Sequence, residues 1–555
     1  MKKLLVIVAL AIVQGAEVCA EVKINAASEN CKAQWFEEFV PMADGVKLYT
    51  IGVAPAGVGK CPIVVIRMPY VKAKRENMAA WEVTRRHFTS RGYACVYQHC
   101  RGCGMSEGDW IPYEHERADG LALLEFVRKL PWYNGEIFLS GSSYAASVHF
   151  AYLDTNPPDV KGASLLVQDV NRYNICYRNG FFKIGLTGSW FVKSYKKKNL
   201  SLKRDSSVDF RQFPLADFPM RYWGEEVPSF DNVLLHPRAD DRFWKSDEPG
   251  SGADFRNALL KSTVPVLLKT AFYDIYTDGV CAMWRELPEA RRANCSLVID
   301  ASNHSGARRG IPAGMVSDFP GGSRGESMAD EVDWFDAVRG KKAFSDNAPL
   351  GKVRYYALWE NAWRTEAELA NGPEKVALPL GEGVRSYKYD PKSKPPAFPG
   401  SGGICFGGMQ IQPPIESRED MVTFVLPPLS ARLDVRGRME AELAVSSDCE
   451  DSSFYIRVCV DKGDGKWLLL RDDIMSLAYD SPYVPGSRRV LRYRFADHAF
   501  RLDKGDRLRV DVAGACEHFA PHPNAKGCSF MEKNPKIAVN RIFAEKSKLI
   551  LFVLQ

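Results

Sequence analysis

A serine on a predicted tight turn is the residue best suited to chemistry in this chain. The apolar run Ile137–Leu139 predicts a buried strand that stops at Gly141, and a helix-compatible run starts at Ala145. Ser143 lies between them, where a sharp strand-to-helix turn would expose its hydroxyl and point the helix N-terminus at it. Such a serine can attack a carbonyl carbon. Ala145 stands where the usual Gly-x-Ser-x-Gly motif has its second glycine, so an ordinary tight turn is the alternative.

Two further residues complete a candidate catalytic triad. A serine hydroxyl is a weak nucleophile, so it needs a general base within hydrogen-bond reach and a third group that orients the base. Asp274 follows the predicted strand 264–268, and His304 follows the predicted strand 296–299. Both lie where loops leave the carboxyl ends of strands, and the chain order Ser143, Asp274, His304 is the one that accompanies such turns. His304 would take the proton from Ser143, and Asp274 would fix the tautomer of His304.

Other assignments of these roles stay open from the residues alone. Asp278 and Asp300 compete with Asp274 for the acid role, and an aspartate after a strand is commonly a turn or cap residue. A loop histidine such as His304 is commonly a surface residue. His149 lies on the predicted helix that leaves the turn, which would carry its ring away from the nucleophile.

The elements around these residues alternate between strands and helices. Short apolar runs predict parallel strands at 62–66, 94–97, 137–139, 264–268 and 296–299, with helices at 76–90, 114–130 and 328–339. This alternation predicts a doubly wound α/β sheet. Residues 171–261 mix aromatic, proline and charged residues without strand periodicity, which predicts a helical cap inserted before the last strands. The aromatic residues of this insertion are candidate pocket walls, with core packing as the alternative: Trp190, Phe191, Tyr222 and Trp223.

Regularly spaced strands dominate the C-terminal part of the chain. Alternating segments separated by turn residues lie at 421–426, 439–445, 454–460, 467–470, 507–512 and 549–553. They predict an all-β jelly roll or sandwich. The predicted division is a signal peptide, 1–20, an α/β-hydrolase domain, 21–170 and 262–348, the helical cap, 171–261, and a jelly-roll domain, 349–555.

The first twenty residues are typical of a secretory signal peptide. Lys2 and Lys3 precede the apolar stretch Leu4–Val13, and Val18–Ala20 has the small residues of a cleavage site. An uncleaved anchor is the alternative, although the stretch is short for a membrane-spanning helix. We therefore expect export to the periplasm or the medium, with cleavage after Ala20.

Composition argues against several classes of partner. A hydrophobic share of 46% and a charged share of 26% are ordinary for a globular protein. The net charge is only +6 over 555 residues, so nucleic acid is not an expected partner. No later segment has the run of apolar residues that stable membrane insertion requires. The sequence implies no cofactor and no metal, and it leaves the oligomeric state open.

The cysteines suggest a mixture of free and paired thiols. Of fourteen cysteines, Cys19 lies in the predicted signal peptide, which leaves an odd number in the mature chain. At least one thiol is then free or pairs between chains. Cys516 and Cys528 could pair near one loop. Cys100 and Cys103 have the C-x-x-C spacing, but no second such pair accompanies them, so a metal or redox role is the lesser alternative.

With these motifs the chain resembles a family of serine hydrolases that comprises bacterial cocaine esterase, X-prolyl dipeptidyl-peptidases, glutaryl-acylases and α-amino-acid ester hydrolases. The resemblance runs through nearly the whole mature chain. The motifs similar to those of the family are R-x-P-Y-x-K at Arg67–Lys72, R-G-x-G-x-S-E-G at Arg101–Gly108, P-W-x-N-G at Pro131–Gly135, G-x-S-Y at Gly141–Tyr144, W-Y-D at Phe272–Asp274 and T-H-G at Asn303–Ser305. Tyr389–Gly403 and Ser446–Asp451 resemble the jelly-roll domain of the family.

The resemblance implies an oxyanion hole. The Tyr70 hydroxyl would supply one donor and the backbone N–H of Tyr144 the other. Fixed donors at the developing oxyanion supply about 3–4 kcal/mol each, which agrees with such a role. Without the resemblance, Tyr70 would be an ordinary aromatic residue at a strand end. Arg101 and Glu107 are expected to be structural.

Some positions depart from the family pattern. His99 stands where an aspartate is usual, Ala146 replaces a glycine and Phe272 replaces a tryptophan, but none of these changes removes a catalytic group. The amino-acid ester hydrolases place carboxylates directly after their catalytic aspartate to hold a substrate ammonium. Here Ile275–Thr277 follow, and the next acid is Asp278. This departure counts against an amino-acid ester and leaves dipeptidyl-peptidase specificity without support.

The sequence therefore predicts an exported serine hydrolase that cleaves a small-molecule acyl ester through an acyl-enzyme on Ser143. One alternative is an X-prolyl dipeptidyl-peptidase, or an amidase or acylase of the same family, acting on short peptides. The remote alternative is a catalytically inert protein whose jelly roll binds carbohydrate.

Overall fold

The computed structural model describes residues 34–71, 78–194, 211–245, 253–304, 319–322, 331–396, 398, 409–414, 418–527 and 529–554. The predicted signal peptide lies outside these residues. Cys528 also lies outside them, so the suggested pairing of Cys516 with Cys528 falls outside the described part of the chain.

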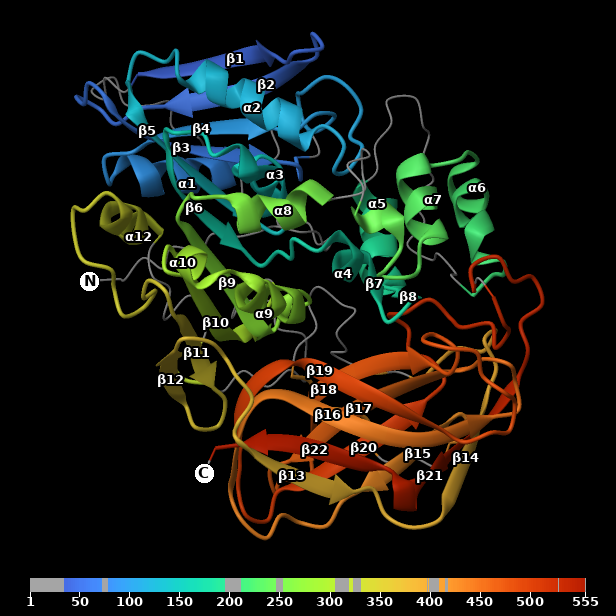
Figure 1. The fold of residues 1–555 in the computed structure, drawn as a ribbon. Helices are drawn as coiled ribbons and strands as arrows, with labels where there is room; N and C mark the ends of the chain where they lie inside the picture. The colour runs from blue at the N-terminus through green and yellow to red at the C-terminus, as the bar shows by residue number, and fades with distance from the viewer. Residues whose placement is uncertain are drawn as a thin grey trace.

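A ten-stranded mixed sheet forms the α/β part of the molecule (Figure 1). Its spatial order is β1 (Trp35–Pro41), β2 (Lys47–Val53), β4 (Ala94–His99), β3 (Cys61–Met68), β5 (Tyr133–Ser142), β6 (Val160–Leu166), β9 (Val266–Tyr273), β10 (Cys295–Asn303), β11 (Val353–Ala357) and β12 (Ala362–Glu366). Neighbours from β4 to β11 pair in parallel, whereas β1, β2 and β12 pair antiparallel. The sheet includes β11 and β12, which follow residue 348, where the sequence suggested that the hydrolase domain ends.

Helices cover both faces of this sheet, as its buried strands require. Alternate residues of β3 belong to two separate apolar cores: Ile63 and Val65 to one, and Val64 and Ile66 to the other. The first core is completed by α2 (Glu116–Val127), α3 (Tyr144–Phe150) and α9 (Thr277–Glu286), and the second by α1 (Met78–Thr89) and α12 (Glu331–Val338). The short α10 (Glu289–Arg292) leads into β10.

Short helices between β6 and β9 form the inserted cap that the sequence predicts. Its elements are α4 (Arg172–Cys176), β7 (Tyr177–Arg178), β8 (Phe181–Phe182), α5 (Ser189–Ser194), α6 (Phe218–Trp223), α7 (Pro228–Leu235) and α8 (Ala253–Lys261), with short 3-10 or π turns between some of them. Aromatic rings fill its centre, because Phe230 contacts Phe182, Phe191 and Trp223 edge-on. Packing of this kind needs no regular sequence period.

Two antiparallel sheets form the C-terminal β-domain (Figure 1). One contains β13 (Glu374–Pro379), β22 (Lys548–Val553), β16 (Leu433–Ser447), β21 (Ala538–Phe543), β14 (Val384–Tyr389) and β19 (Arg489–Leu502). The other contains β15 (Met421–Val425), β20 (Arg507–Ala513), β17 (Ser453–Asp461) and β18 (Trp467–Ser476). Apolar side chains of both sheets belong to one core, as the predicted jelly roll requires.

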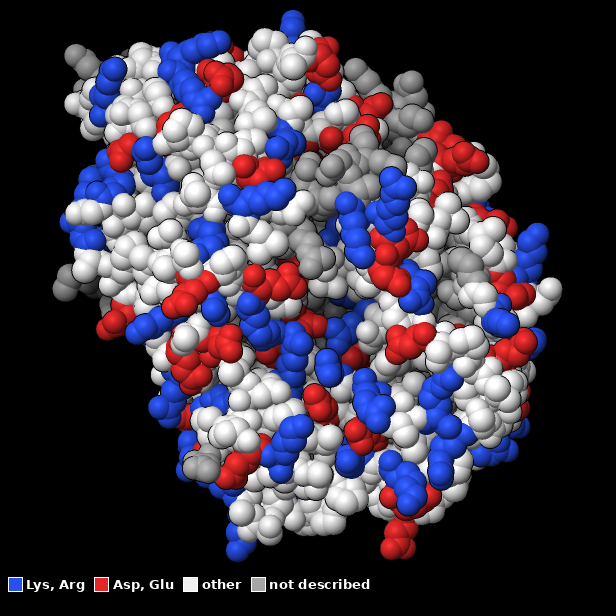
Figure 2. All heavy atoms as spheres, viewed as in Figure 1, with Lys and Arg blue, Asp and Glu red and all other residues white. Residues whose placement is uncertain are grey.

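Within the described residues, no helix combines the length and the apolar character needed to cross a membrane. On the face shown in Figure 2, lysine and arginine side chains are mixed with aspartate and glutamate side chains.

Candidate active site

Ser143 occupies a strained turn between β5 and α3. Its backbone has φ 56° and ψ −134°, a region that residues with a side chain rarely adopt. Two hydrogen bonds hold the turn: the N–H of Ser143 donates to the Leu166 carbonyl of β6 at 2.9 Å, and its carbonyl accepts from the Ala146 N–H at 2.8 Å. This is the strand-to-helix turn that the sequence predicts, and it sets the serine apart from the regular strand and helix.

The turn depends on a glycine that precedes it. A Cβ atom on Gly141 would lie 2.1 Å from the Ala145 carbonyl oxygen, well inside van der Waals contact. The start of α3 therefore approaches β5 too closely for any other residue at that position. Ala145 itself is buried, so the structure accommodates a methyl group where the usual motif has its second glycine.

The three predicted triad residues lie in one hydrogen-bonded chain. His304 Nε2 lies 3.0 Å from Ser143 Oγ, and His304 Nδ1 lies 3.0 Å from Asp274 Oδ1. All three residues are at most 6% exposed, so bulk water screens these contacts weakly. The arrangement can move a proton from the serine to the imidazole while the carboxylate stabilises the imidazolium.

Parallel strands bring the acid and the base together. Tyr273 of β9 pairs with Asn303 of β10. The next residue on each strand is Asp274 or His304, so the two side chains start from neighbouring positions. The Asp274 carboxylate is fixed further by the Thr270 hydroxyl, which donates to Oδ2 at 3.0 Å, and by the Tyr276 N–H, which donates to Oδ1 at 3.1 Å. Thr270 was missed in the sequence. Its position four residues before the acid, near the end of the same strand, is the signal that could have found it.

The residues that the sequence left as alternatives for the acid and the base make other contacts. Asp278 forms ion pairs with Arg178 and Arg438, and Asp300 accepts from the N–H of Ser302 at 2.8 Å. His149 bonds the Tyr152 hydroxyl and the Ser140 carbonyl, and burial lowers its pKa to about 3.

Tyr70 and Tyr144 bring two donors to the same side of the serine. The Tyr70 hydroxyl lies 3.4 Å from Ser143 Oγ, and the backbone N–H of Tyr144 donates to that hydroxyl at 3.3 Å. An oxygen of a substrate carbonyl attacked by Ser143 would therefore meet both groups.

A buried polar network holds the side chain of Tyr144 next to the strand-to-helix turn at Ser143, which is called the elbow from here on. Its hydroxyl donates to Glu116 Oε1 at 2.7 Å and accepts from the Tyr113 N–H at 2.6 Å. Burial raises the pKa of the Glu116 carboxyl, and Arg67, itself fully buried, lies 3.6 Å from it. Nothing in the local sequence singles out Glu116, which lies 28 residues before Tyr144.

Arg101 and Glu107 hold loops together. Arg101 bridges Asp119 and Asp44 at 2.6 and 2.7 Å, and Glu107 accepts from the Lys47 N–H at 3.0 Å.

The cap contributes an aromatic wall next to the elbow. Trp190 packs on Tyr144 and on Trp110, with ring centroids 5.3 and 5.2 Å apart. Phe191 and Trp223 are buried in the centre of the cap, and Tyr222 stacks on the Phe218 ring. Trp190, one of the four candidate aromatics, thus contacts a residue of the candidate site.

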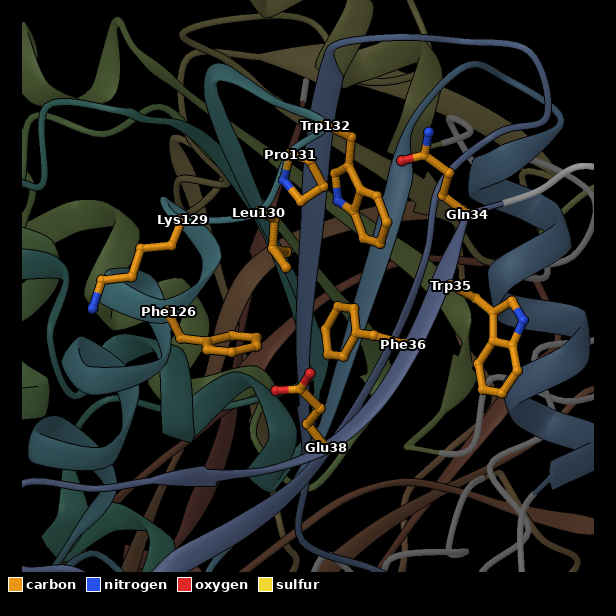
Figure 3. A pocket seen from close by; sticks show the side chains of 9 residues that line it. All are labelled: Gln34, Trp35, Phe36, Glu38, Phe126, Lys129, Leu130, Pro131 and Trp132. Atoms are coloured by element: carbon orange, nitrogen blue, oxygen red, sulfur yellow. The ribbon is translucent and has the colours of Figure 1, made fainter.

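A separate pocket lies at the β1 edge of the ten-stranded sheet. Figure 3 shows its lining side chains, which come from the segments 34–38 and 126–132. It has a volume of about 570 Å³, and none of the five candidate site residues lines it.

Among the described residues, no cluster of three or more His, Cys, Asp or Glu side chains could hold a metal ion.

Comparison with known proteins fits this geometry. Residues 44–306 match the model of the X-Pro dipeptidyl-peptidase (S15 family), and residues 345–546 match that of the X-Pro dipeptidyl-peptidase C-terminal non-catalytic domain. The chain belongs to this family of serine hydrolases. It is 23% identical over 502 residues to cocaine esterase of Rhodococcus sp. (strain MB1 Bresler). The aligned region covers 80% of this chain and 83% of that enzyme.

Solved structures share the fold over almost the entire chain. An aminopeptidase from a marine sediment Thaumarchaeota archaeon has a TM-score of 0.77 at 20% identity, covering 98% of this chain and 99% of that one. An α-amino acid ester hydrolase has a TM-score of 0.77 at 19% identity, and the match covers 97% of this chain and 100% of that one. At these identities the likeness concerns the fold.

Proposed function

We propose that this serine hydrolase cleaves the ester bond of a small-molecule substrate through a covalent acyl-enzyme on Ser143. The observation that carries the proposal is the continuous chain from Ser143 Oγ through His304 to Asp274, with 3.0 Å at each step. A serine on a strained turn beside a buried imidazole and carboxylate has the arrangement that nucleophilic catalysis needs.

The reaction proceeds in two halves. His304 Nε2 accepts the hydroxyl proton as Ser143 Oγ attacks the substrate carbonyl, and the oxyanion accepts hydrogen bonds from Tyr70 and the Tyr144 N–H. His304 then gives the proton to the departing alcohol as the ester C–O bond breaks. In the second half His304 takes a proton from water, hydroxide attacks the acyl carbon, and the proton returns to Ser143 Oγ as the acid leaves.

The competing proposal is an X-Pro dipeptidyl-peptidase, the activity named in both family models. Such a peptidase must hold the free ammonium group of a peptide, which calls for carboxylates beside the triad. The three residues after Asp274 are Ile275, Tyr276 and Thr277, and they provide none. We therefore favour an ester.

A small substrate panel separates the two activities. Hydrolysis of 4-nitrophenyl acetate and butyrate is compared with that of Ala-Pro-4-nitroanilide, in the wild type and in Ser143→Ala. We expect ester turnover without amide cleavage, and a loss of about 10⁴- to 10⁶-fold in kcat for Ser143→Ala. Strong Ala-Pro cleavage would identify a peptidase instead. Turnover of neither substrate would favour a non-catalytic role.

We also propose that the protein is exported after cleavage following Ala20. Support comes from the basic, apolar and small-residue order of residues 1–20. Expression of the full chain in a bacterial host, followed by N-terminal sequencing of the periplasmic and secreted fractions, tests it. A mature chain that begins at Glu21 is expected, and an intact N-terminus in the cytoplasm would contradict it.

A further inference from the structure

Arg172 is a buried cation close to the candidate active site. It is the first residue of α4, which follows β6, and β6 pairs with the elbow strand β5. The cap chain therefore begins at the carboxyl end of the sheet, the same end as the elbow. Arg172 is only 3% exposed.

Within the part of the chain that the structure describes, its guanidinium group has few partners, and none of them is an anion. The group lies 3.6 Å from the centre of the Tyr113 ring, and Nη1 donates to Cys176 Sγ at 3.0 Å. Nε is buried without a hydrogen-bond partner, and the described groups that most affect the Arg172 guanidinium are a thiol and phenols, with no carboxylate among them. Burial raises the pKa values of the Cys176 thiol and the Tyr113 phenol, so both neighbours stay neutral.

Two neighbours connect this cation to the catalytic groups. The Tyr113 ring beneath it packs on Tyr144, with centroids 4.7 Å apart, and Tyr144 supplies a candidate oxyanion donor. The phenols of Tyr144 and Tyr276 also lie near enough to Arg172 to affect its pKa if they were ionised. The Tyr276 ring lies against the imidazole of His304, with centroids 5.5 Å apart. The cation thus lies close to aromatic rings that pack on Tyr144, on the oxyanion side, and on His304.

An unpaired buried cation is costly, and the ring face of Tyr113 offsets only part of that cost. The edge of the guanidinium formed by Nε and Nη2 has no protein acceptor among the described residues. This edge carries two parallel N–H donors, which match the two oxygens of a carboxylate. The residues directly after the catalytic acid carry no negative charge that would repel such a group.

We infer that Arg172 binds a carboxylate carried by the substrate, so that the preferred esters are anionic. This inference rests on the proposed function, since it specifies the substrate of the same site. The carboxylate belongs either to the acyl group or to the alcohol, and paired substrates distinguish the two positions.

The experiment measures kcat/KM for two matched pairs of esters. Mono-4-nitrophenyl glutarate is compared with 4-nitrophenyl valerate, and 4-carboxyphenyl butyrate with 4-carbamoylphenyl butyrate. We expect the wild type to prefer the anionic member of one pair, and Arg172→Gln to reduce that preference roughly 10- to 100-fold, as for the loss of a charged hydrogen bond. Arg172→Lys should restore part of it. The neutral esters report whether each variant is folded and active.

Should Arg172→Gln fail to fold, inhibition of the wild type and of Arg172→Lys is compared instead. Glutarate is then expected to compete with 4-nitrophenyl butyrate much more strongly than the neutral amide of valeric acid does. Neutral-ester turnover without any anionic preference, or a preference that survives in Arg172→Gln, would overturn the inference and leave the proposed function intact. Absence of all ester turnover in the wild type would overturn both.

Discussion

At the scale of single residues, the candidate site is built from side chains that lie far apart in the sequence. Ser143 and His304 are 161 residues apart, and their side-chain atoms lie 3.0 Å apart. The sequence could predict this pair because each residue follows a recognisable strand. It could not predict the support of Tyr144 by Glu116, because no local pattern reports which helix residue faces the elbow.

Tyr70 offers the sharpest residue-scale prediction. Tyr70→Phe removes one of the two donors next to Ser143 Oγ and keeps the aromatic ring. We expect kcat to fall by about 10²- to 10³-fold with little change in KM, since the lost bond strengthens only in the transition state. Steady-state kinetics on a 4-nitrophenyl ester measures both constants.

Tyr133→Phe is the matched control for this prediction. The Tyr133 hydroxyl donates to Asp159, away from the triad, so its loss should leave kcat near the wild-type value. Equal effects of the two variants would show that Tyr70 has no special part in the reaction.

At the scale of elements, the close contact of β5 and α3 determines the position of Ser143. Gly141→Ala would place a Cβ 2.1 Å from the Ala145 carbonyl oxygen, so the helix or the strand must shift. We expect the free energy of unfolding to fall by more than about 2 kcal/mol, together with a loss of ester turnover. Urea denaturation and the ester assay measure the two effects.

Gly59→Ala serves as the control because nothing lies within 4 Å of an added Cβ and its φ is not in the left-handed region. Its stability should stay within about 0.5 kcal/mol of the wild type. A Gly141→Ala protein as stable and active as this control would contradict the close-contact explanation.

Strands were easier to predict than the cap for a physical reason. The apolar run 264–268 marks β9, which is buried along its whole length, and such runs have few other uses in a soluble fold. The cap is stabilised by rings from short, irregular elements, such as the contact of Phe191 with Phe230. Side-chain packing of this kind leaves no period in the sequence, so only its helical character could be predicted.

At the scale of the whole molecule, a chain of ion pairs joins the three parts. Arg178 of the cap donates to Asp473 of the jelly roll at 2.7 and 2.8 Å and also pairs with Asp278 of α9. Arg285 of α9 reaches Asp497 of β19 through two bonds of 2.9 Å. These contacts place the C-terminal domain against α9, the helix that follows Asp274, although both carboxylates from the jelly roll are distant in sequence.

Buried histidines should make the stability of the whole molecule depend on pH. Burial lowers the pKa of His99 and of His518 to about 4, below the usual 6.5 of the unfolded chain. Below pH 6.5 the unfolded state therefore binds protons that the native state does not. Each histidine should remove about 1.4 kcal/mol of unfolding free energy per pH unit as the pH falls from 6.5 toward 4, and its contribution is complete above 6.5.

The variant His99→Asn tests one of these contributions. The Asn side-chain oxygen can accept the Met105 N–H that His99 Nδ1 now accepts at 3.2 Å, while the titrating group is lost. Urea denaturation gives the free energy of unfolding at each pH. Between pH 6.5 and 5, the slope of this free energy against pH should be smaller than in the wild type by the equivalent of about one proton. An unchanged slope would mean that His99 is protonated in the native state at these pH values.

The most direct test of the central claim asks which serine is the nucleophile. The protein is treated with a fluorophosphonate, and the modified peptide is mapped by mass spectrometry in the wild type, Ser143→Ala and His304→Ala. We predict a single adduct on Ser143, none in Ser143→Ala, and labelling slowed by several orders of magnitude in His304→Ala. An adduct on another serine that survives in Ser143→Ala, or no adduct in the wild type, would contradict the assignment of Ser143 as the catalytic nucleophile.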